Sequence, residues 1–76
     1  MHRFKTGDRV RLSRPRLWPV GAAGVLATVI LGPSTVAGRA RSFIQYVIEF
    51  DEPQLDGDGD GPYVSGTVDE EELDIV

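Results

Sequence analysis

The chain has 76 residues, 41% hydrophobic and 26% charged, so it forms one domain at most, and we treat residues 1–76 as a single domain. It has no cysteine, which excludes a disulfide framework, a cysteine zinc site, an iron–sulfur cluster of its own and a thiol nucleophile. Residues 1–41 hold all eight Lys and Arg and one acid, a net charge of +7, whereas residues 42–76 hold eleven acids and no base, a net charge of −11.

The composition also bears on location and partners. The lack of cysteine fits a reducing cytoplasm, where we expect the protein to reside. The apolar run at residues 20–31 has the outline of a secretory signal, but Gly21 and Gly24 interrupt it, and it is too short to span a bilayer as a helix. We therefore expect the run to lead into a strand and expect no membrane association.

The pattern of apolar residues is typical of an all-β protein. Val, Ile, Thr, Phe and Tyr cluster in short runs separated by Gly and Pro, and no segment keeps helical spacing for three turns. Near the N-terminus, Val10 and Leu12 alternate with Arg9 and Arg11, which predicts a strand with one buried face. In chain order the pattern predicts strands at 9–13, 25–31, 43–50, 63–68 and 73–76, loops at 14–24, 32–42 and 51–62, and a helical turn at 69–72.

The last elements complete this prediction. The strand at 43–50 places alternate apolar residues on one face, and Leu73 and Ile75 in the final strand are expected to point inward. Five short strands with a helical turn before the last strand describe a small, strongly bent barrel.

The frame "FKTGDRVRL … GAAGVLATV … YVIEFDEP … VDEEELDIV" resembles a group of SH3-like small barrels. It is most similar to the variable chain of ferredoxin–thioredoxin reductase, and also to the barrel of the nitrile hydratase β-subunit and to the small peripheral subunit of photosystem I. The resemblance implies a five-stranded SH3-like barrel in which the first strand pairs with the last. It also implies an accessory subunit whose larger partner holds any metal centre. The residues that carry it are Phe4, Gly7, Asp8, Val10, Arg11, Gly24, Val25, Tyr46, Ile48, Phe50, Asp51, Glu71, Glu72 and Leu73.

Arginines in the two long loops are the candidate partner-binding residues. Trp and Arg are typical anchors of protein interfaces, and Trp18 lies among arginines and prolines, although it could equally be a lid on the core. By contrast, Arg9 and Arg11 on the first strand are expected to pair with acids at 69–72. The candidate partner-binding residues are Arg14, Arg16, Trp18, Arg39 and Arg41.

The segment "DGDGDG" at residues 56–61 has the opening of a calcium-binding loop. Asp56, Asp58 and Asp60 stand at alternate positions, but the twelfth position is Thr67 instead of the bidentate Glu that such a loop needs. We therefore expect a solvated hairpin tip, in which Gly and Asp favour turns, and no metal site, with weak calcium binding as the alternative.

No arrangement of residues predicts catalysis. His2 is the only histidine and lies near the N-terminus, and the carboxylates lie in a loop tip and a helical turn. We therefore expect a protein that is not an enzyme and needs no cofactor: an accessory module that docks on a larger, redox or metal-containing protein. The alternative is a nucleic-acid-binding barrel of the KOW or Tudor type that uses the basic first half.

Overall fold

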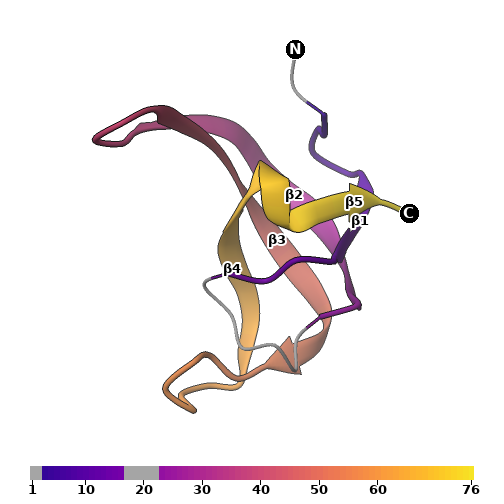
Figure 1. Cartoon of the computed structure of the whole chain (residues 1–76). Coiled ribbons are helices and arrows are strands. Elements are labelled where there is room, and N and C mark those ends of the chain that lie inside the picture. Colours follow the sequence, from indigo (N-terminus) through magenta and orange to yellow (C-terminus); the bar gives the residue numbers. More distant parts are fainter. Residues whose placement is uncertain (1–2, 17–22) are drawn as a thin grey trace.

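The computed structural model describes residues 3–16 and 23–76, which form one five-stranded antiparallel sheet (Figure 1). In chain order the elements are β1 (Arg9–Leu12), β2 (Val25–Ala37), β3 (Ser42–Gln54), β4 (Tyr63–Asp69), the 3₁₀ turn η2 (Glu70–Glu72) and β5 (Leu73–Ile75). The predicted all-β class, the five strands and the helical turn before the last strand are confirmed.

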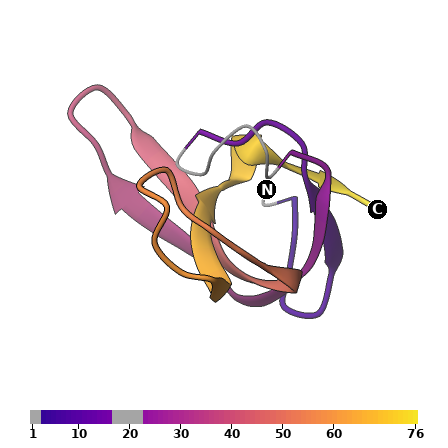
Figure 2. The same ribbon diagram turned by 90° about the horizontal axis from the view of Figure 1, so that it is seen from below.

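The sheet curls on itself but is not closed. Its strand order is β4-β3-β2-β1-β5, so β4 and β5 are its two edges in the described part of the chain. The first strand does pair with the last, because β1 lies between β2 and β5. The turn η2 carries the chain from the β4 edge to the β5 edge (Figure 2).

Strands β2 and β3 are longer than predicted. Residues 32–37 and 51–54, expected in loops, belong to the strands. Gly32 and Pro33 suggested a break, but β2 continues through them because its register with β3 shifts there. A proline is tolerated at such an irregularity, where no ladder hydrogen bond is needed from its nitrogen.

The longer strands create a projecting ribbon. β1 pairs with β2 only at Val25–Thr28, and the ladder between β4 and β3 reaches no farther toward the start of β3 than Gln45. The hairpin at residues 30–47 therefore extends away from the curled sheet, and in its outer part, residues 35–44, the two strands pair only with each other, at the upper left of Figures 1 and 2. We call this ribbon the arm.

The hydrophobic core fills the inside of the curled sheet. The alternation predicted for β1 is confirmed, because Val10 and Leu12 are buried while Arg9 and Arg11 are exposed. Ile75, predicted to point inward, is instead 59% exposed, since it ends the short β5 at an open edge. The buried hydrophobic residues are Phe4, Val10, Leu12, Ala27, Val29, Tyr46, Ile48, Phe50, Val68 and Leu73.

Among the described residues, no helix has the length and apolar character needed to cross a membrane.

Candidate functional site

Arginines of the first half of the chain meet acids of the second half around η2. Arg14 follows β1, and its guanidinium makes two hydrogen bonds to the Asp74 carboxylate, at 3.0 and 3.2 Å. It also donates to the backbone carbonyls of Glu71 and Leu73, at 2.8 and 3.2 Å. The planar guanidinium of an arginine can make several such contacts at once. Arg14 therefore holds the segment that follows β1 against η2 and β5.

These contacts acidify Asp74. Its hydrogen bonds with Arg14, with a smaller contribution from Ser13, lower the pKa of Asp74 to about 2. The same contact raises the pKa of Arg14. The side chains of Arg14 and Asp74 are 54% and 44% exposed. The ion pair therefore adds little stability and mainly orients the segment after β1 relative to β5.

Arg16 is anchored through its backbone to a buried carboxylate. Glu72 is fully buried, and its two oxygens accept the backbone N–H groups of Arg16 and Asp69, each at 2.6 Å. The bond from Asp69 is part of the capping box that begins η2. The Arg16 guanidinium is half exposed and lies 3.4 Å from Asp69 and 3.7 Å from Glu71.

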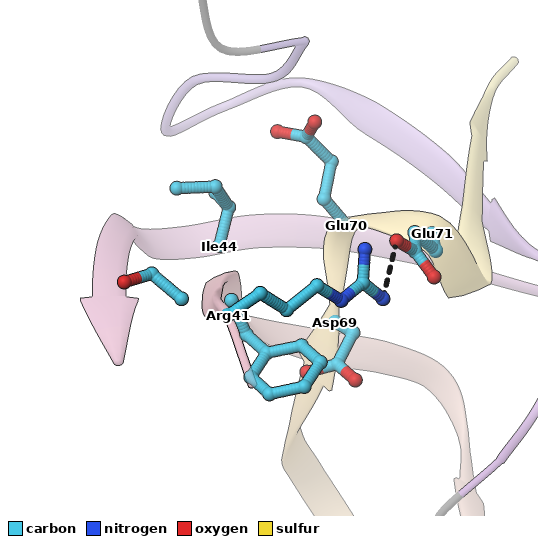
Figure 3. Close-up of a pocket in the computed structure, with 7 residues that line it drawn as sticks. Arg41, Ile44, Asp69, Glu70 and Glu71 are labelled. Carbon is cyan, nitrogen blue, oxygen red and sulfur yellow. Dashed lines mark ion pairs between the residues drawn. The ribbon is translucent and has the colours of Figure 1, made fainter. Parts of the chain in front are cut away.

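A cavity of about 150 Å³ lies between the arm and η2 (Figure 3). Arg41 reaches across it from the residue just before β3, and its guanidinium lies 2.8 Å from the Glu71 carboxylate and 4.9 Å from the centre of the Phe43 ring. The ion pair and the cation–π contact hold the arginine in this position. The remaining lining residues are Ser42, Ile44, Asp69 and Glu70.

The other two acids beside this cavity are engaged by the chain itself. The hydroxyl of buried Tyr46 donates to Glu70 at 2.7 Å and accepts the backbone N–H of Phe4 at 3.3 Å. Burial, followed by the hydrogen bond to Glu70, raises the pKa of Tyr46. Asp69 accepts a hydrogen bond from the Gln45 side chain at 2.9 Å. These carboxylates therefore act as acceptors that join η2 to β3 and to the N-terminal segment.

The pairing predicted for the β1 arginines with acids at 69–72 is wrong. Arg9 makes a bidentate pair with Asp51, at 2.5 and 2.8 Å, and also donates to Thr28 at 2.8 Å. The hydrogen bonds from Arg9 lower the pKa of Asp51. Arg9 lies opposite Thr28 in β2, so its side chain crosses β2 to reach β3. Within residues 3–16 and 23–76, Arg11 has no ion pair.

The remaining two candidate partner-binding residues have different outcomes. Arg39 lies at the tip of the arm, is exposed, and makes no ion pair with the described residues. Trp18 lies outside the described residues. The structure therefore separates the candidates into Arg14 and Arg16, which contact η2 and β5, and Arg39 and Arg41, which belong to the arm.

An apolar face on the arm was missed by the sequence prediction. Leu31 and Val47 lie directly opposite each other, as do Val36 and Phe43, and all four side chains share one face of the sheet. Leu31 is 61% exposed and Val36 is 41% exposed, while Phe43 and Val47 are half-buried. Ile30, 42% exposed, occupies the bulge beside Leu31. The uninterrupted apolar run at 25–31 was the available signal, but it did not reveal which residues would be exposed.

The three aspartates of the β3–β4 loop lie close together. One carboxylate oxygen from each of Asp56, Asp58 and Asp60 lies within 4.8 Å of the other two. One oxygen of Asp56 accepts the backbone N–H groups of Asp58 and Asp60, both at 2.9 Å. These bonds are those of a side chain that stabilises a turn, as expected for a hairpin tip. The alternative of weak calcium binding stays a prediction.

Comparison of the chain with protein-family models, with curated proteins and with solved structures found no match. The interpretation of the site therefore rests on its residues and geometry.

Proposed function

We propose that the chain is a non-catalytic interaction module that docks as an accessory subunit on a larger, redox or metal-containing protein. The observation that carries the proposal is the apolar face of the arm, where Leu31, Val36 and Ile30 are exposed beside Phe43 and Val47. The polar pair Ser34–Gln45 lies between the two apolar pairs on this face. Exposed apolar side chains gathered on one face of a small protein mark interaction surfaces, because water contact with them is unfavourable.

The charged residues beside this face suit a protein partner. Arg39 and Arg41 lie at the tip of the arm, and Arg is enriched in the centres of protein interfaces. The resemblance to accessory subunits supports the same proposal, since such a subunit contributes a docking surface while its partner supplies the redox or metal chemistry.

The contacts that the acidic side chains make within the fold support a non-catalytic role. Glu72 accepts two backbone N–H groups, Glu70 accepts the Tyr46 hydroxyl, and Asp74 holds Arg14. Each of these carboxylates is an acceptor within the fold, which is a structural role.

The ion pairs of the basic side chains argue against the alternative, nucleic-acid binding. Phosphates would have to compete with acids of the same chain for the basic side chains, because, among the described residues, five of the eight Lys and Arg are in ion pairs. The paired residues are Arg3, Arg9, Arg14, Arg16 and Arg41.

The test is capture of partners from a lysate of the source organism with the tagged chain, at low and at high salt, identifying both protein and nucleic acid. We expect one protein, larger than the chain and in stoichiometric amount, that is retained at high salt because apolar contacts are not screened. Nucleic acid that is released by salt, with no protein bound, would establish the alternative instead.

A further inference from the structure

The two ends of the molecule carry opposite charge. Residues 30–48 include Arg39 and Arg41 and no acid, whereas residues 49–64, which we call the acidic end, include six acids and no base. The arm projects at the upper left of Figure 1, and the loop of the acidic end lies at the bottom. The two surfaces therefore cannot meet within one copy of the chain.

Both surfaces also expose apolar side chains. The arm exposes Ile30, Leu31 and Val36, between 41% and 61%. The acidic end exposes Leu55, Tyr63 and Val64, by 50%, 41% and 62%. An apolar surface with a basic tip and an apolar surface with an acidic loop are complementary in both respects.

Most of the charge of the acidic end has no ion-pair partner among the described residues. Of its six acids only Asp51 has an ion pair with a described residue, to Arg9. The negative charge of Asp56, with smaller contributions from burial and from Asp60, raises the pKa of Tyr63 beside them. Carboxylates this close repel one another, and a cationic side chain placed beside them would relieve that repulsion.

We propose that copies of this chain associate head to tail, the arm of one copy docking on the acidic end of the next. Arg39 of one copy then lies beside Asp58 and Asp60 of the other, and the apolar face of the arm covers Leu55 and Val64. Because two different patches are joined, the contact is heterologous and can continue from copy to copy. The inference does not rest on the proposed function, but a partner bound to the arm would compete with it.

The first test is sedimentation velocity of the purified chain from about 10 μM to about 1 mM, at about 50 mM and about 500 mM salt. The expected result is an average mass that rises with concentration at low salt, passes through dimer and larger species, and falls at high salt. A chain that stays monomeric throughout overturns the proposal, whatever the lysate capture yields.

The second test separates head-to-tail association from a symmetric dimer. An arm variant, Leu31→Ser with Arg39→Glu, and an end variant, Asp58→Lys with Asp60→Lys, change exposed side chains only. Each variant alone is expected to associate at least about tenfold more weakly than the wild type.

An equimolar mixture of the two variants distinguishes head-to-tail association from a symmetric dimer. The intact arm of the end variant should bind the intact acidic end of the arm variant, so an equimolar mixture should form dimers and nothing larger. Lys5→Glu, which changes the charge by the same amount as Arg39→Glu but at an exposed residue outside both surfaces, should associate like the wild type. A mixture that stays monomeric, or an end variant that associates like the wild type, overturns the proposal. Circular dichroism spectra matching the wild type exclude unfolding as the cause.

Discussion

At the scale of single residues, Glu72 is the clearest case of a polar side chain that the fold requires. It is fully buried, and its two oxygens accept backbone N–H groups from the loop after β1 and from the start of η2. A buried donor that loses its acceptor costs about 1–3 kcal/mol, because water cannot replace the bond.

Glu72→Ala should therefore lower the free energy of unfolding by about 2–4 kcal/mol, since two donors lose their acceptor. Glu72→Gln keeps one acceptor oxygen and should cost less than the alanine variant. Glu71→Gln, in the same turn but exposed, is the matched control and should cost at most about 1 kcal/mol. Urea unfolding measures all three, and equal losses at Glu71 and Glu72 would contradict this role.

A second prediction at this scale concerns pH. The pKa of Asp74 is lowered from 3.8 to about 2, chiefly by Arg14, so its ionised form is favoured in the folded state. The stabilisation is fully present above about pH 4 and is lost as the pH falls through the folded pKa. Asp74→Asn should therefore lose less stability between about pH 4 and pH 2 than the wild type. Urea unfolding across this range tests it, and parallel losses in the two proteins would show that the ion pair has no effect.

At the scale of elements, the turn at the tip of the arm depends on Gly38. Its backbone N–H donates to the Arg41 carbonyl at 2.9 Å, closing the connection between β2 and β3. A Cβ atom at this position would lie 2.5 Å from both that carbonyl oxygen and the Phe43 ring. The turn therefore tolerates only glycine without a shift of the backbone or the ring.

Gly38→Ala should destabilise the protein by about 1–3 kcal/mol through this overpacking. Gly57→Ala is the matched control, because a Cβ there meets nothing within 4 Å, and it should change stability by less than about 1 kcal/mol. Thermal unfolding compares the two, and a Gly38→Ala variant as stable as the control would show that the tip is not packed as described.

The elements also show which features could be predicted from the sequence. The alternation of Val10 and Leu12 with Arg9 and Arg11 was sufficient to predict β1 and its buried face. The full length of β2 was not predictable, because Gly32 and Pro33 are typical of a break and only the shifted register lets the strand continue. The exposed face of the arm depends on that same irregularity, so it too required the structure.

At the scale of the whole molecule, the structure explains the uneven charge of the sequence. Pairing of β1 with β5 brings Arg14 to Asp74, and the hairpin of β2 and β3 brings Arg41 to Glu71. That the two halves would neutralise each other was predictable, but the individual pairs were not. Arg9 reaches Asp51 because β2 lies between β1 and β3 and the register of both pairings brings the two side chains to the same place on the sheet. After this pairing, the basic charge that remains includes Arg39 on the arm, and the unpaired acids gather mainly at the acidic end.

The most direct test of docking through the arm compares two exposed leucines. Leu31 on the arm is 61% exposed and Leu55 at the acidic end is 50% exposed, so replacing either by serine should leave the fold intact. The measurement is the amount of the partner protein captured from the lysate by each tagged variant at high salt, relative to the wild type. The account predicts that Leu31→Ser captures at least about tenfold less partner while Leu55→Ser captures as much as the wild type. Equal capture by Leu31→Ser and the wild type would contradict it.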